Sequence, residues 1–382
     1  NFNKIIDEKN TVSQNAYYHL GECYMNLEKK AAALNAFKSA SEMNFDKKIQ
    51  EDAALNYAKL SYEEGNPFKS VAEVLQAYLK AYPESKAYEE INNLLVSSFL
   101  NQQDYEGALK FLSQKKSAEN IALILEVSLY RGIQLFNKNN YKKALPYFIN
   151  GKKSNLLEVK QRAQYWEAET EYRLENYKIA LTKFTSLNIF LKPSNTADFL
   201  YIDYNIGYSH FKLKEYEKAG EAFEIFLQKD TIPDTIKYDA LLRLGDSYFA
   251  ITKYKEAITT YQKVTDNYGL GADYAAYQIG MSSGFIDENE AKIIILKEVI
   301  NNYPVSNLKD DALYQLGNTY SKIKDFKNAH FSYNRLLEKH PKSVFLSRTL
   351  LRQGLLYFNE DLNMKALLKY KDVVSRFPNS PE

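Results

Sequence analysis

The sequence has very little of what several protein classes depend on. A single cysteine, Cys23, among 382 residues excludes an intrachain disulfide but diagnoses no compartment. Only 14 glycines and nine prolines are present, which disfavours all-β folds with many tight turns. No apolar run approaches the roughly 18–20 residues of a membrane span. The charges of the 50 basic and 48 acidic residues nearly cancel, so the chain lacks the excess of positive charge that is typical of nucleic-acid-binding proteins.

Tyrosine is the residue type that stands out. The chain holds 32 tyrosines and one tryptophan, and 45% of its residues are hydrophobic. This apolar content is enough for a packed core and excludes a disordered chain. The tyrosine count fits packed helical layers in which the ring edges reach solvent.

A repeated pattern runs through nearly the whole chain. In five copies an apolar residue precedes a glycine, and in six copies an alanine follows the glycine twelve residues later and an aromatic residue comes four beyond that. The copies lie about 37 residues apart on average. The small-residue positions are Gly21, Ala58, Val96, Gly132, Ala168, Gly207, Gly245, Gly280, Gly317 and Gly354.

This pattern resembles the tetratricopeptide repeat. The resemblance implies an all-α fold, a right-handed superhelical solenoid of about ten antiparallel helix pairs. Helix A of each pair carries the small residue, and helix B carries the alanine and the aromatic residue. We expect the two backbones to approach closely at the small residues, and the aromatic ring to fill the gap toward the next repeat. One hairpin cannot bury both of its faces, so stacking supplies the core.

The pattern also predicts the boundaries of the repeats. Residues 1–10 are interpreted as the end of a preceding repeat, because Phe2-Asn3-Lys4-Ile5-Ile6 reads like the end of a helix B. Residues 11–192 hold repeats one to five, and residues 193–382 hold repeats six to ten. We expect a longer array, or a neighbouring domain, to cover the two ends; frayed ends are the alternative.

Two kinds of turn recur between the helices. Within a repeat, Asp104, Asn140 and Asp325 are expected to cap helix B. Between repeats, proline is expected to stop helix B and the serine two residues later to cap the next helix A. This second junction reads Tyr82-Pro83-Glu84-Ser85, Tyr303-Pro304-Val305-Ser306, His340-Pro341-Lys342-Ser343 and Phe377-Pro378-Asn379-Ser380.

The aromatic-Pro-x-Ser junction resembles the repeats of bacterial envelope proteins. Examples are the repeat lipoprotein of the outer-membrane β-barrel assembly machinery and the periplasmic coordinator of envelope constriction. The resemblance implies a place in the periplasm, in a complex that is associated with the membrane. The cytoplasm is the alternative.

The sequence shows no catalytic constellation, and it predicts no enzyme, cofactor or metal. The four histidines lie far apart and lack metal-ligand spacing, and distant repeats of a solenoid rarely touch. His210 and His330 are therefore interpreted as structural. Cys23 is interpreted as a small buried hydrophobe on helix A. No phosphate loop, His-Glu-x-x-His motif or nucleophile elbow occurs.

The resemblance implies that partners bind the inner face of the superhelix, which is lined by helix A. The function we expect is a non-catalytic scaffold that binds segments of partner proteins on this concave face. The residues transferred from the family's pattern are mostly tyrosines, which are enriched in binding hot spots. They are Tyr165, Tyr172, Tyr201, Tyr204, Tyr208, Phe211, Asp239, Asp246, Tyr274 and Tyr277.

Two alternatives stay open at this point. The rings can instead pack between adjacent A helices, as bulky rings in stacked helices usually do. The chain can also be the non-catalytic arm of a larger enzyme or regulator. The Lys/Asn pattern of the carboxylate clamp that binds chaperone tails is absent from these positions, which disfavours a chaperone adaptor.

Overall fold

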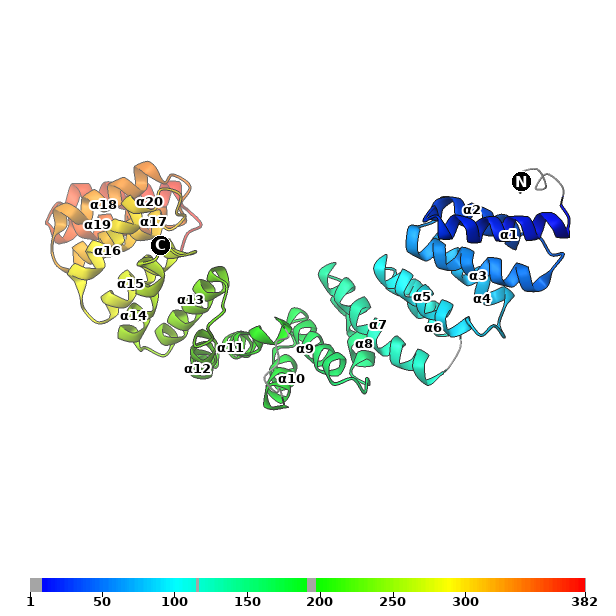
Figure 1. Ribbon diagram of the computed structural model, residues 1–382. Helices are drawn as coiled ribbons and strands as arrows, with labels where there is room; N and C mark the ends of the chain where they lie inside the picture. The colour runs from blue at the N-terminus through cyan, green and yellow to red at the C-terminus, as the bar shows by residue number, and fades with distance from the viewer. Residues whose placement is uncertain (1–8, 115–116, 191–196, 382) are drawn as a thin grey trace. The chain divides into compact units, whose positions relative to one another are not determined.

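The computed structural model describes residues 9–114, 117–190 and 197–381 (Figure 1). This part of the chain contains twenty α-helices and no strand, which confirms the all-α repeat fold with its ten helix pairs. Two compact units divide at Trp166 and Glu167, inside helix α9. The predicted boundary at residues 192 and 193 and the helical end at Phe2-Asn3-Lys4-Ile5-Ile6 lie outside the described residues.

In unit 1 each helix up to α8 packs against the next one along the chain. The odd-numbered helices are the A helices and the even-numbered ones the B helices. Their bounds are α1 (Thr11–Asn26), α2 (Lys30–Ser41), α3 (Lys47–Glu64), α4 (Val71–Ala81), α5 (Tyr88–Asn101), α6 (Tyr105–Leu112), α7 (Ala118–Asn137), α8 (Tyr141–Gly151) and α9 (Leu157–Arg173).

Unit 2 repeats the same arrangement from α10 onward, again with each helix packed on its successor. A short 3-10 helix, Ala197–Tyr201, leads into α11. The bounds are α10 (Tyr177–Phe190), α11 (Ile202–Lys212), α12 (Tyr216–Leu227), α13 (Asp234–Ala250), α14 (Tyr254–Thr265), α15 (Ala272–Phe285), α16 (Asn289–Asn302), α17 (Lys309–Lys322), α18 (Phe326–Lys339), α19 (Leu346–Asn359) and α20 (Asn363–Arg376).

Each of the seven glycines at the small-residue positions faces one side chain of its own helix B, sixteen residues later. A Cβ built on Gly245 would lie 2.5 Å from the Tyr261 ring, and one on Gly132 would lie 2.5 Å from the Phe148 ring. The aromatic residue therefore fills the space above the small residue of its own repeat. The ring also meets the next repeat, as predicted: the ring centroids of Phe148 and Trp166 lie 6.4 Å apart, and so do those of Tyr261 and Tyr274.

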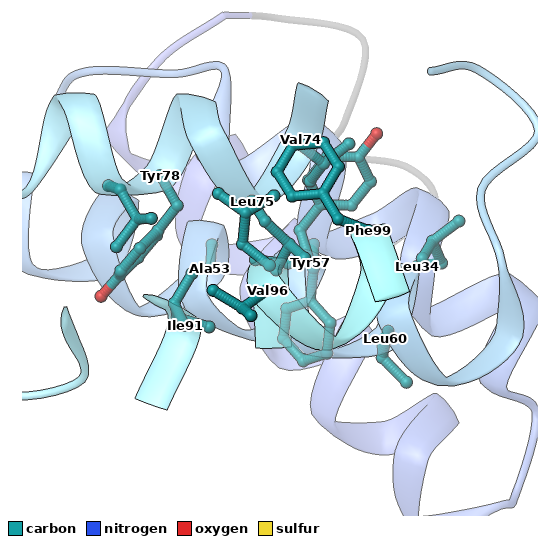
Figure 2. Packing of buried hydrophobic residues seen from close by; sticks show 14 of the residues in the cluster. Leu34, Ala53, Tyr57, Leu60, Val74, Leu75, Tyr78, Ile91, Val96 and Phe99 are labelled. Carbon is teal, nitrogen blue, oxygen red and sulfur yellow. The ribbon is translucent and has the colours of Figure 1, made fainter. Parts of the chain in front are cut away.

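The two members of this contact compensate each other in volume. Ala58 is followed by Val74 in place of a ring, and Val96 is followed by Leu112. All four side chains are buried, with at most 5% exposed. Interiors are close-packed, so a larger residue on helix A favours a smaller one on helix B, although Ala168 is followed by the fully buried ring of Phe184. Figure 2 shows Val74 and Val96 among the buried side chains of α2 to α5.

Helix A ends in the same way in nearly every repeat. The residue in the turn has a positive φ, and the next backbone N–H donates to the carbonyl five residues earlier, as Asp325 does to Tyr320 at 2.9 Å. This is the Schellman arrangement, which satisfies the last carbonyls of a helix. The turn residues are Glu28, Gln103, Asn139, Glu175, Lys214, Thr252, Asp287, Lys324 and Asp361, and Gly65 has a positive φ after α3.

The capping predictions are confirmed only in part. Asp104 and Asp325 accept bonds from the backbone N–H groups of Gly107 and Asn328, at 2.9 and 3.1 Å, whereas Asn140 makes no such bond. The prolines follow the ends of α4, α16, α18 and α20 as predicted. The junction serines do not cap helix A: Ser306 accepts from Leu308, which is itself the cap of α17. The serine instead closes the turn that precedes the helix.

The close contact at Gly245 predicts a loss of stability when a methyl group is added. Tyr261 is fully buried and its hydroxyl is held by Asp246 at 2.6 Å, so the ring has little room to move. We expect Gly245→Ala to lower the free energy of unfolding by about 1 kcal/mol net, because overpacking outweighs the gain in helix propensity. Urea unfolding of the full chain, followed by circular dichroism, measures it.

Gly220 in α12 supplies the matched control. A Cβ there would lie 3.6 Å from the nearest atom, a Leu244 methyl carbon, which is ordinary van der Waals contact. Gly220→Ala should therefore stabilise the protein by up to about 1 kcal/mol. Equal shifts of the same sign in both variants would contradict the proposed role of the contact at Gly245.

Candidate functional site

The structure places nine of the ten predicted binding residues in unit 2 and Tyr165 in unit 1. Tyr165 is only 6% exposed and meets Trp166 edge to face at 5.7 Å, so it offers little surface. The other aromatic residues of the set are half-buried. Their use by a partner stays a prediction.

Tyr204 and Tyr208 on α11 form an aromatic cluster with helix α12. Their ring centroids lie 4.9 Å apart, and both rings meet Phe223 edge to face, at 6.0 and 5.5 Å. The Tyr204 ring also lies 5.2 Å from that of Phe226. The rings thus pack between the two helices of their own repeat.

The hydroxyl groups of the same two tyrosines reach the next repeat. Both donate to Oδ2 of Asp239 on α13, and the Tyr204 bond is 2.7 Å long. Arg243, one turn further along α13, pairs with Oδ1 of Asp239 at 3.8 Å. Asp239 therefore ties helix A of repeat six to helix A of repeat seven.

Asp246 forms a second centre of the same kind. Its side chain is 10% exposed, and Oδ1 accepts from the hydroxyls of Tyr261 and Tyr274 at 2.6 and 2.8 Å. Oδ2 accepts from Arg243 at 2.5 Å. Gln278 donates to the Tyr274 hydroxyl at 2.8 Å. Arg243 joins the two centres, and we call the whole set the Asp239–Asp246 network.

Burial keeps the phenols of this network protonated. It raises the pKa of Tyr208 to about 12, with the hydrogen bond to Asp239 and its charge adding to the effect. Burial and the charge of Asp246 raise the pKa of Tyr274 to about 12 as well. The pKa values of Tyr204 and Tyr261 are raised further, first by burial. These hydroxyls are donors to the carboxylates throughout the physiological range.

The other predicted residues surround this network. Tyr172 meets Tyr177 and Tyr208 edge to face, at 5.2 and 6.5 Å. Tyr201 lies 6.4 Å from Phe226, and Phe211 lies 5.3 Å from Tyr216. Burial and then the charges of Asp311 and Asp310 raise the pKa of Tyr277 to about 12.

A spacing in the sequence marks these bonds between repeats. A tyrosine three residues before one small position faces an aspartate six residues before the next. Tyr204 and Asp239 follow this rule, and so do Tyr18 and Asp52, whose hydroxyl and carboxylate are also hydrogen-bonded. The predicted set includes Asp239 and Asp246, but it misses Arg243, Tyr261 and the pair in repeats one and two.

An open groove in unit 1 is a further feature that the sequence did not indicate. It lies along the A helices α1 and α3 and has a volume of about 530 Å³. Its lining combines carboxylates, an aromatic ring and aliphatic side chains, which suits a polar segment with apolar side chains. The lining residues are Tyr18, Lys48, Ile49, Glu51, Asp52 and Leu55.

The histidines and the cysteine have separate surroundings. His210 pairs with Glu215 at 2.7 Å, and His330 pairs with Glu360 at 2.5 Å while stacking on Tyr357. Cys23 is exposed, so the expectation that it is a buried hydrophobe is wrong.

In the described ranges no three His, Cys, Asp or Glu side chains gather as metal ligands would. Among the described helices, none has the length and apolar character needed to cross a bilayer.

Comparisons with known proteins identify the repeats. Two profiles described as tetratricopeptide repeat match the chain, one at residues 201–230, 239–269, 311–343 and 348–380, the other at residues 14–47. No curated protein matches the sequence.

One solved structure shows the same fold. The C-terminal part of a TPR repeat-containing protein from Cytophaga hutchinsonii is 18% identical, and the match covers 66% of this chain and 96% of that one with a TM-score of 0.52. The crystal structure of MamA is 25% identical, with 44% and 93% covered and a TM-score of 0.39. At this identity the first likeness establishes the fold alone.

Proposed function

We propose that this chain, which carries tetratricopeptide repeats, is a non-catalytic scaffold whose A helices hold a segment of a partner protein on the concave face of the repeat array. Stacking buries the faces that neighbouring hairpins share and leaves an exposed surface on the A helices that a partner can contact. Tetratricopeptide proteins bind protein partners, and this family property supports the proposal.

The groove between α1 and α3 is the observation that carries the proposal. Its volume lies within the range of sites that enclose a ligand group, and its opening runs along two successive A helices. The lining holds two carboxylates, Glu51 and Asp52, and one cation, Lys48, so the groove favours a partner segment that presents a basic side chain beside an apolar one.

The place of action belongs to the same proposal. The aromatic-Pro-x-Ser junctions support the periplasm of a bacterial envelope, within a membrane-associated complex. All three such junctions between helices of the described part form the same turn, with the serine hydroxyl accepting the backbone N–H two residues later.

Capture of partner proteins from two cell fractions tests both the groove and the proposed location in the envelope. The full chain and a charge-swapped variant, Lys48→Glu with Glu51→Lys, are immobilised and exposed separately to envelope and cytosolic fractions of the native cell. The swap keeps the net charge but reverses the pattern of the groove. We expect proteins that the wild-type chain enriches from the envelope fraction to be lost by the variant, as measured by quantitative mass spectrometry.

A second swap, Lys80→Glu with Glu84→Lys, provides the control because both residues are exposed and lie outside the groove. It should retain every partner. Retention of all partners by the groove variant would contradict the site, and enrichment from the cytosolic fraction alone would contradict the place.

A further inference from the structure

A smaller pocket lies in unit 2, lined by side chains from the B helices α16 and α18 and from the A helix α17 between them in the chain. Its volume is about 140 Å³. The floor is buried and mostly apolar, and consists of Ile300, Leu313, Leu316, Tyr320 and Ser332. The rim is exposed, and consists of Lys297, Asn301, Asn328, Phe331 and Arg335.

The size of the pocket selects its occupant. Sites for small molecules and cofactors usually enclose about 300–1,000 Å³, so this pocket is too small for such a ligand. It has room for one side chain of moderate size. Because Leu313 and Leu316 are at most 3% exposed, the floor favours an aliphatic side chain over a polar one. Single side chains inserted in this way anchor many protein interfaces.

The charged side chains at the rim favour a partner segment of negative charge. None of the ten lining residues is acidic, whereas Lys297 and Arg335 are both cations. The Lys297 ammonium lies 5.7 Å from the centroid of the Tyr320 ring, which places its charge over the pocket floor. Two amide side chains, Asn301 and Asn328, supply further hydrogen-bonding groups on the same rim.

One ring in the lining of the pocket is exposed. Phe331 on α18 is 63% exposed, although it lies next to the buried Ser332 in the lining. An aliphatic side chain in the pocket would cover this ring and remove apolar surface from water. A carboxylate before or after that side chain would meet Lys297 or Arg335 at the rim.

We propose that this pocket docks an acidic segment of a partner protein, with one aliphatic side chain inserted between α16 and α18 and the neighbouring carboxylates paired with Lys297 and Arg335. The surface lies on B helices, so it is distinct from the A-helix groove and adds a second point of attachment to the scaffold. Two attachment points on one chain raise the effective concentration of each partner near the other.

Three labelled peptides test the anchor and the charge separately. They are Ser-Asp-Glu-Leu-Glu-Asp-Ser, the same peptide with serine in place of leucine, and Ser-Lys-Lys-Leu-Lys-Lys-Ser. Fluorescence anisotropy with the full chain should show that the acidic leucine peptide binds at least about tenfold more tightly than either of the others. Its affinity should fall as salt is added.

Charge reversal locates the binding on the pocket. The variant Lys297→Glu with Arg335→Glu alters two exposed side chains, and we expect it to weaken the acidic leucine peptide by about tenfold or more. Lys255→Glu with Lys263→Glu, two exposed lysines on the B helix α14, is the matched control and should have little effect. Equal binding of the leucine and serine peptides, or unchanged binding by the pocket variant, would overturn the proposal.

Discussion

Asp246→Ala should lower the free energy of unfolding of unit 2 by about 3 kcal/mol, the lower end of the range for breaking a buried ion pair. The substitution removes the acceptor of Tyr261, Tyr274 and Arg243 at once. The side chain of Arg243 is 29% exposed, which lets water compensate part of the loss. Hydrogen exchange of α13 to α15 in the full chain measures the effect where it arises.

Asp287→Ala is the matched control for this prediction. Asp287 pairs with Lys322 at 2.7 Å, but its side chain is 83% exposed, and surface ion pairs contribute little. The control should therefore change hydrogen exchange and melting far less than Asp246→Ala does, since it leaves only the small cost of an alanine at the positive φ of this turn. Asp246→Asn keeps the shape but removes the charge, and should fall between the two. If Asp246→Ala behaved like Asp287→Ala, the Asp239–Asp246 network would not stabilise the repeats.

Contacts within one hairpin are easier to predict from the sequence than contacts between hairpins. The small residue on helix A and its partner on helix B lie sixteen residues apart within one hairpin, so their pairing is a local relation that repeats visibly. It predicts the helix pairs and their order. The bond of Tyr204 to Asp239 crosses between hairpins, and it depends on the rotation of each helix about its axis. The sequence marks such a bond only once the register of the repeats is known, through the spacing that Tyr204 and Asp239 share with Tyr18 and Asp52.

The turns show the same limit at a smaller scale. Proline marks the end of helix B reliably, because it has no N–H to donate and restricts the residue before it. Ser306 suggests the start of α17, yet the helix begins three residues later, at Lys309. A serine hydroxyl can serve either a helix or a turn, so its presence fixes the neighbourhood of the boundary but not the residue. The structure assigns it to the turn.

The predicted binding surface raises a similar question, because its residues already have partners within the chain. The hydroxyls of Tyr204 and Tyr208 donate to Asp239, and their rings pack on Phe223. These contacts favour the structural alternative for the two tyrosines. The rings are nevertheless half-buried and not fully enclosed, so part of each ring surface is open to a partner.

Replacing both tyrosines separates the two roles. We expect Tyr204→Ala with Tyr208→Ala to cost about 2 kcal/mol or more per ring, below the value for fully buried aromatic residues because these rings are half-buried. The sum will not be additive, since the two rings touch each other at 4.9 Å. Melting of the full chain measures the loss. Tyr204→Phe with Tyr208→Phe keeps the rings and removes only the hydroxyls, so it should cost less.

Tyr268→Ala controls for the loss of a tyrosine from unit 2, because this side chain is 85% exposed. It should leave melting unchanged. Partner capture by the same variants then assigns the surface. A double alanine variant that melts like the wild type but captures no partner would show that the rings form a binding surface. The opposite result is a double alanine variant that loses stability and a phenylalanine variant that captures partners normally. In that case the hydroxyls serve to join the repeats, and the groove between α1 and α3 is the surface for partners.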